Sequence, residues 1–139
     1  MLPKFEALEA VKNAGVVAVV RGRSEENSYK ISKASIEGGV KAIELAFTSP
    51  NADVTIKRLS GEYADDPSVV VGAGTVLDPS TARLAMIAGA KFIVSPSYNA
   101  EVAEICNLYC VPYMPGCFTP SEVQKALETG ADVIKIFPG

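Results

Sequence analysis

Six short runs rich in Val and Ile recur along the chain at nearly even spacing, and this spacing most constrains the fold. The runs are VVAVV (16–20), VKAIEL (40–45), SVVVG (68–72), KFIVS (91–95), VPYM (111–114) and DVIKIF (132–137). Successive runs begin 20 to 28 residues apart, which leaves room for one helix between each pair. Runs that are apolar at nearly every position are typical of parallel strands buried on both faces. The pattern predicts strands that alternate with helices.

The segments between the runs carry residues that mark helix boundaries. Candidate N-cap residues begin five of these segments: Ser24, Ser49, Asp78, Asn99 and Thr119. Pro follows directly at Ser49-Pro50, Asp78-Pro79 and Thr119-Pro120, and Thr119 with Glu122 has the spacing of a capping box. Glycines mark the expected helix ends: Gly38, Gly61, Gly89 and Gly130.

The length of the repeat favours a (β/α) barrel. A step of this size is tight for a doubly wound sheet with elaborated loops and normal for a TIM-type barrel. Eight such units need on the order of 185–200 residues, whereas the chain has 139. We therefore expect one incomplete domain over residues 1–139: a parallel α/β barrel of the TIM type with about six of its eight βα units.

Composition excludes several classes of function. The formal net charge of −3 argues against a nucleic-acid partner. No apolar run approaches the ~20 residues that span a bilayer. The chain has no His, which removes His-based acid–base chemistry and His-containing metal sites.

The cysteines indicate a compartment. Cys106, Cys110 and Cys117 are an odd number in a chain with no recognisable leader, so we expect reduced packing thiols and a cytoplasmic protein. Cys106 and Cys110 are expected on one helix face, with Cys117 in a loop. A metal would want a fourth ligand, and the sequence offers none nearby.

An internal repeat relates three of the predicted strands. Residues 39–45, 89–95 and 130–136 share the order of Gly, two residues and a buried run. Glu44, Val94 and Lys135 occupy the same repeat position in the second, fourth and sixth strands. Alternate strands of a barrel supply side chains to the same interior layer. The repeat thus predicts that two charged side chains point into a core.

Lys135 is the most informative of these residues. Period-two alternation places it on one face of its strand with Val133 and Phe137, and places Ile134 and Ile136 on the other face, toward the helices. Burial favours a neutral, nucleophilic amine, which is what Schiff-base formation with a carbonyl requires. The alternative is an edge-strand lysine that extends to solvent.

Glu44 is the expected partner of Lys135. A lone buried carboxylate is costly unless it is paired, and its repeat position predicts that it lies near Lys135. There it can move protons, directly or through water. The alternative is a structural ion pair with Lys135 or Arg21.

Other candidates also fall at carboxyl ends of predicted strands, where a barrel has its active site. Arg21 can hold a carboxylate in its fork or can simply be a surface residue. The GAGT segment at 72–75 allows close approach of backbone to a ligand, but Leu77 stands where a dinucleotide fingerprint needs Gly. SPS at 95–97 and MPG at 114–116 are expected to be rigid loops at the mouth.

The strand ends together resemble a known family. VVAVVRG, GGVKAIELAFTSP, VVVGAGTVLDP, AGAKFIVSPSYN, VPYMPGCFTPSE and ADVIKIFPG are similar, in order, to those of the class I 2-keto-3-deoxy-6-phosphogluconate aldolases, which include 4-hydroxy-2-oxoglutarate aldolases. The resemblance covers essentially the whole chain. It implies cleavage of either 2-keto acid to pyruvate and an aldehyde, glyceraldehyde 3-phosphate or glyoxylate, through a lysine Schiff base. It also implies no metal or organic cofactor, a homotrimer, and a place in Entner–Doudoroff carbohydrate metabolism.

The resemblance also implies roles for individual residues. Lys135 matches the Schiff-base lysine, and Glu44 matches the glutamate that moves protons. The residues that match substrate-binding positions are Arg21, Thr75, Pro96, Phe137, Gly74 and Thr48. Thr48 stands where some relatives carry Arg, which shifts the expected carboxylate binding toward Arg21. Phosphate-binding residues are expected beyond Gly139.

Two alternatives remain at this point. The chain can be an aldolase-like fragment that is inactive or serves only in assembly. It can also be a different barrel enzyme, such as a phosphosugar epimerase or isomerase, that uses acid–base residues and no covalent lysine.

Overall fold

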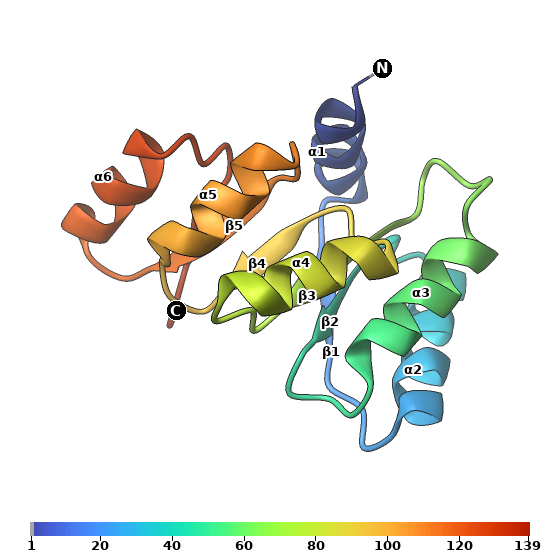
Figure 1. Cartoon of the computed structure of the whole chain (residues 1–139). Coiled ribbons are helices and arrows are strands. Elements are labelled where there is room, and N and C mark those ends of the chain that lie inside the picture. Colours follow the sequence, from blue (N-terminus) through green and yellow to red (C-terminus); the bar gives the residue numbers. More distant parts are fainter. Residues whose placement is uncertain (1) are drawn as a thin grey trace.

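Strands and helices alternate along residues 2–139, the part of the chain that the computed structural model describes (Figure 1). The helices are α1 (Pro3–Ala14), α2 (Glu25–Glu37), α3 (Ala52–Glu62), α4 (Pro79–Ala88), α5 (Ala100–Leu108) and α6 (Pro120–Glu128). The strands are β1 (Val17–Val20), β2 (Ala42–Ala46), β3 (Val70–Gly74), β4 (Ile93–Ser95), β5 (Tyr113–Cys117) and β6 (Lys135–Ile136). A strand lies in or overlaps each predicted run, so the predicted alternation is confirmed.

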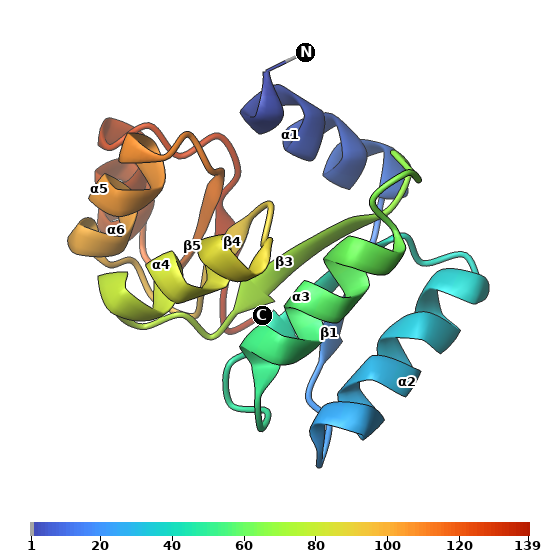
Figure 2. The same cartoon turned by 45° about the vertical axis from the view of Figure 1, so that its right-hand side comes forward.

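The strands form one six-stranded parallel sheet in the order β1-β2-β3-β4-β5-β6. Helices α2 to α6 lie along one face of this sheet, whereas α1 lies at the amino-terminal ends of the strands (Figures 1 and 2). The C-terminus lies away from α1, toward the opposite end of the sheet (Figures 1 and 2). This is the incomplete (β/α) barrel that the spacing predicts.

The inner face of the sheet has its own small core. Its buried residues are Ala42, Val70, Phe92, Val94 and Met114. Leu8 and Val11 of α1 pack against this cluster, so the first helix covers the amino-terminal end of the interior. The Nζ of Lys4 lies 2.9 Å from Oδ2 of Asp132 and ties α1 to the segment before β6.

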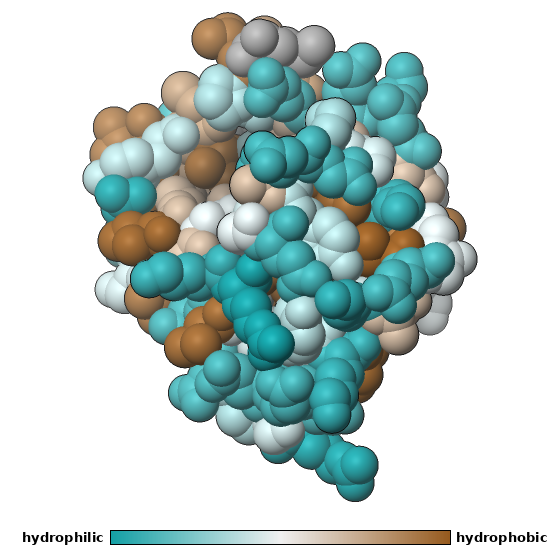
Figure 3. Space-filling view, turned by 90° about the vertical axis from the view of Figure 1, so that its right-hand side faces the viewer, coloured by the Kyte–Doolittle hydropathy of each residue, from teal (hydrophilic) through white to brown (hydrophobic). Residues whose placement is uncertain are grey.

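A larger core lies between the sheet and the outer helices. It includes Ile43 and Leu45 from β2, Val71 and Ala73 from β3, and Ile93 from β4. In β2 and β3 these residues alternate with those of the inner face, which is the period-two pattern of a strand buried on both sides. Beyond the helices, the face seen from the side of α2 and α3 is mainly hydrophilic (Figure 3).

Four predicted helix starts are confirmed by side-chain caps. Ser24, Asp78 and Asn99 each accept a hydrogen bond from a backbone N–H of the first turn. Thr119 and Glu122 form the complete capping box. These bonds satisfy N–H groups that have no partner inside a helix.

The predicted boundaries of the third helix are wrong at both ends. Its N-cap is Asn51, with φ 51° and no side-chain cap bond, rather than Ser49. The backbone N–H of Ser49 donates to the carbonyl of Ala46 at 2.9 Å, so Ser49-Pro50 belongs to the turn that leaves β2. Gly61 lies inside α3, which continues to Glu62.

Two loop assignments also need correction. The MPG segment at 114–116 lies within β5, which continues to Cys117, so neither is in a loop. A Cβ on Gly116 would overlap the carbonyl oxygen of Pro96, and this close packing of adjacent strands explains why a glycine extends the strand here. Cys110 follows the end of α5 in a turn with φ 55°, and so does not share a helix face with Cys106.

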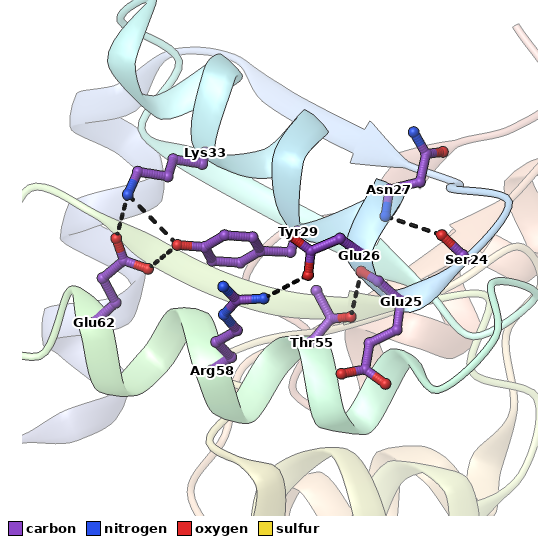
Figure 4. A network of polar contacts seen from close by, with 9 residues as sticks. All are labelled: Ser24, Glu25, Glu26, Asn27, Tyr29, Lys33, Thr55, Arg58 and Glu62. Carbon is purple, nitrogen blue, oxygen red and sulfur yellow. Dashed lines mark hydrogen bonds and ion pairs between the residues drawn. The ribbon is translucent and has the colours of Figure 1, made fainter.

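A polar network joins α2 to α3 (Figure 4). The hydroxyl of Tyr29 donates to Oε2 of Glu62 at 2.5 Å, and Nζ of Lys33 donates to Oε1 of Glu62 at 2.8 Å. The guanidinium of Arg58 lies 3.3 Å from the centre of the Tyr29 ring and donates to Glu26 at 2.9 Å. The bonds from Lys33 and Tyr29 lower the pKa of Glu62.

Among residues 2–139, no helix is both long and apolar enough to cross a membrane.

Candidate active site

The predicted site residues lie on or just after five of the parallel strands. Glu44 is in β2 and Lys135 is in β6, while Arg21, Thr75 and Pro96 follow β1, β3 and β4. Because all strands run in the same direction, these positions lie toward the carboxyl-terminal end of the sheet. That is the end at which barrels hold their active sites.

Glu44 is buried in the barrel interior, with 5% of its surface exposed. It lies two residues after Ala42, so its side chain is on the same face of β2 as that inner-core residue. Its register partner on β3 is Gly72. A Cβ on Gly74 would overlap its carboxylate and lie 2.6 Å from Cδ. The carboxylate of Glu44 therefore occupies the space that a side chain at Gly74 would fill.

The charges around Glu44 come from the two predicted cations. Burial raises the pKa of Glu44, while the positive charges of Lys135 and Arg21 partly oppose this increase. Lys135 and Arg21 thus act on the same carboxylate from β6 and from the end of β1. The structure brings Lys135 and Arg21 each within electrostatic reach of Glu44, as the repeat predicts for Lys135.

Lys135 is half-buried on β6, where it pairs with Gly116 of β5. Its Nζ lies 4.7 Å from the centre of the Phe137 ring, a distance at which a cation and an aromatic face attract each other. The strand is shorter than predicted, and Ile136 is 64% exposed rather than packed on a helix. Within residues 2–139 no helix follows β6 to cover that side chain.

Thr75 is held in an uncommon conformation at the end of β3. Its φ is 53°, in the left-handed region that β-branched residues rarely adopt. Backbone strain of this kind clusters at functional sites when the surroundings impose it. The structure thus supplies a reason to single out Thr75 that is independent of the sequence motif.

The remaining predicted residues are less buried than Glu44. Arg21 is exposed, Pro96 is half-buried after β4, and Phe137 is exposed. Thr48 is exposed on the loop after β2, and the contacts of the described residues do not tie it to Glu44 or Lys135. Carboxyl-end placement alone therefore supports Thr48.

Sequence reasoning missed two buried serines near these strand ends. The Oγ of Ser95, at the end of β4, donates to the carbonyl of Val76 at 2.5 Å. The Oγ of Ser49 is buried after β2 and has no partner among the described residues. The sequence does contain a clue to Ser95. It lies two residues after Ile93, so it is a polar residue on the face of the strand that packs against the helices.

A cleft lies at the other end of the sheet. It has a volume of about 740 Å³ and lies between α1, the end of α3 and the start of β3, against Ala10, Tyr63 and Val70. None of the predicted site residues lines it. The predicted site residues are therefore separate from this cleft.

An amine and a carboxylate inside a barrel, with an arginine at the mouth, define a class of site. The amine can attack a carbonyl, the carboxylate can move protons, and the guanidinium can hold an anionic group. The fold is that of a (β/α) barrel, and a site with these three groups could perform carbonyl chemistry on an anionic substrate.

Comparison with known proteins gives the family. The family described as "Aldolase: KDPG and KHG aldolase" matches residues 8–139, and the chain belongs to it. A 2-dehydro-3-deoxy-phosphogluconate aldolase of Treponema pallidum is 39% identical over 99% of the chain. A 2-dehydro-3-deoxy-6-phosphogalactonate aldolase of Escherichia coli is 33% identical over 88% of the chain.

The likeness extends to solved structures. The KDPG aldolase of Legionella pneumophila, with pyruvate captured as a covalent carbinolamine, superimposes with a TM-score of 0.84 at 25% identity over 99% of the chain. The chain spans 63% and 59% of the two relatives above and 64% of that structure. The chain thus matches rather less than two thirds of each of these proteins.

Proposed function

We propose that this chain carries the Schiff-base half of a class I aldolase site, which cleaves a 2-keto acid to pyruvate and an aldehyde. The observation that carries the proposal is the interior carboxylate of Glu44, on which Lys135 and Arg21 both act. A carboxylate that retains a proton more readily than usual, beside an amine, suits proton transfer during carbonyl chemistry.

The proposed reaction begins when the neutral amine of Lys135 attacks the C2 ketone to give a carbinolamine. Glu44 donates a proton to the departing hydroxyl, so that loss of water gives a protonated imine, which accepts the electron pair of the C3–C4 bond. Glu44, through a water, takes the proton of the C4 hydroxyl as that bond breaks, and the aldehyde leaves. Proton return to C3 of the enamine and hydrolysis of the imine release pyruvate and regenerate Lys135.

Arg21 and the Thr75 hydroxyl are proposed to hold the carboxylate of the substrate. Pro96 and Phe137 would line the pocket, with Gly74 and Thr48 beside the bound keto acid. Substrates of the phosphogluconate type and of the hydroxyoxoglutarate type both satisfy this arrangement, because they share the pyruvyl half.

Two further properties are proposed on the family alone. We expect homotrimers in the cytoplasm, and the molar mass of the purified protein by light scattering tests the oligomer. A monomer at micromolar concentration would contradict it.

Trapping tests the covalent step. Pyruvate with sodium borohydride should add one reduced pyruvyl group to the chain, and peptide mass spectrometry should place it on Lys135. Lys135→Ala should abolish the adduct. Lys91→Ala, which changes an exposed lysine two residues before β4, should retain it. Glu44→Gln should trap pyruvate but turn over slowly. An adduct that survives Lys135→Ala refutes the assignment, and absence of any adduct favours a barrel enzyme without a covalent lysine.

A further inference from the structure

The loop after β3 must be held in place, because Thr75 does not favour its own conformation. A β-branched residue with φ 53° lies outside its preferred backbone regions. Such a conformation persists only when surrounding interactions impose it. The question is therefore which groups fix the backbone on each side of Thr75.

Three hydrogen bonds hold the residues that flank Thr75. The carbonyl of Gly74 accepts the backbone N–H of Phe47 at 2.9 Å, on the β2 side. The N–H of Val76 donates to the carbonyl of Val94 at 3.2 Å, and the carbonyl of Val76 accepts the hydroxyl of Ser95 at 2.5 Å. Ser95 is thus the one member of this clamp that acts through its side chain.

The orientation of Ser95 keeps it away from any substrate. Its side chain is on the same face of β4 as that of Ile93, which packs in the outer core, and it is fully buried. Val76 is fully buried as well, so water cannot replace the hydroxyl as a donor to its carbonyl without a local opening. A buried carbonyl that loses its donor is costly. Ser95 also shares a side-chain hydrogen bond with Tyr113, but its route to Thr75 is the backbone of Val76.

We propose that Ser95 is a positioning residue, which locks the backbone at Val76 and so holds the hydroxyl of Thr75 toward the bound keto acid. The part that concerns the keto acid rests on the proposed function. The part that concerns the backbone rests only on the hydrogen bonds above. The two parts can be measured separately.

The test uses three variants and two measurements. Ser95→Ala removes the hydroxyl, and Ser95→Thr retains it. Ser60→Ala is the matched control, because Ser60 donates to the carbonyl of Gly89 at 3.2 Å between α3 and the end of α4. The first measurement is hydrogen exchange of the Val76 amide relative to that of Ala73, which donates to Phe92 at 3.0 Å. The second is the pyruvate concentration that gives half-maximal borohydride trapping.

Loss of one such bond predicts a change of about five- to tenfold in each measurement. Ser95→Ala should speed exchange at Val76 relative to Ala73 and raise the half-maximal pyruvate concentration, with little change in trapping at saturation. Ser95→Thr should restore both values, and Ser60→Ala should leave both near those of the unmodified chain. Equal shifts in Ser95→Ala and Ser60→Ala, or no shift in Ser95→Ala, would overturn the proposal.

The two proposals fail in different ways. If the unmodified chain traps no pyruvate, the proposed function is refuted. Exchange at Val76 alone then decides whether Ser95 holds the loop, and unchanged exchange in Ser95→Ala refutes that as well.

Discussion

Replacement of Gly74 by Ala should displace the carboxylate of Glu44. The new Cβ would overlap the carboxylate oxygen and lie 2.6 Å from Cδ and 2.7 Å from Cγ of Glu44. Ordinary carbon–carbon contacts are about 3.5–4.0 Å, so roughly 1 Å of movement is required. Glu44 is 5% exposed and cannot simply turn into solvent.

The expected cost follows from this overlap. Forcing extra atoms into a packed core costs about 1–3 kcal/mol. Gly74 does not have a left-handed φ, so alanine adds no backbone strain. Alanine also restricts the unfolded chain, which stabilises by about 0.4–1 kcal/mol when the native backbone allows it. In the presence of Glu44 the net loss should be about 1–2 kcal/mol.

A double-mutant cycle isolates the contact. Urea unfolding would be measured for the unmodified chain, Gly74→Ala, Glu44→Ala and the double variant. Once Glu44 is shortened, Gly74→Ala should be neutral or slightly stabilising, which gives a coupling of about 1–3 kcal/mol. Gly61→Ala is the control, because a Cβ there meets nothing within 4 Å. If Gly74→Ala costs the same with and without the Glu44 side chain, the proposed steric contact is wrong.

Two further predictions concern pH. The raised pKa of Glu44 means that the folded chain holds its proton more tightly, so this group makes stability fall as pH rises above its ordinary value of 4.5. Glu44→Gln should therefore gain stability relative to the unmodified chain from pH 4 to 8 in urea unfolding, and a constant difference would contradict this. The lowered pKa of Glu62 acts in the other direction, because its contribution is present above 4.5 and is lost as pH falls through the lowered value. Glu62→Gln should thus flatten the acid side of the stability curve, and an unchanged slope between pH 5 and 3 would refute the role of the α2–α3 network.

Much of the site follows from local alternation along the strands. In β2, Ala42 belongs to the inner core and Ile43 to the outer core, so Glu44 must face inward. The repeat then relates Glu44 to Lys135 on β6, and the shared effect on the Glu44 carboxylate agrees with that relation. Both inferences rest on the alternation of side chains between the two faces of a strand, which neighbouring residues alone determine.

The features that sequence could not supply depend on contacts between distant segments. Thr75 adopts a left-handed backbone because hydrogen bonds with Phe47, Val94 and Ser95 fix the residues on either side of it. Ser49-Pro50 differs, because its bond is local: the N–H of Ser49 donates to the carbonyl of Ala46 in the turn after β2, and α3 begins only after Asn51. For Thr75, partners outside the local pattern therefore decide the conformation.

Because β6 is short, the reactivity of Lys135 should depend on how stably this strand pairs with the sheet. Lys135 is one of the two residues that form β6. Among residues 2–139 this strand is hydrogen-bonded only to β5. If β6 is docked for a fraction of the time, the observed rate of adduct formation is the intrinsic rate multiplied by that fraction. Adduct formation would in turn favour the docked state, because a ligand that engages only one of two states shifts the population toward it. Pyruvate and strand pairing should therefore be mutually cooperative in this chain.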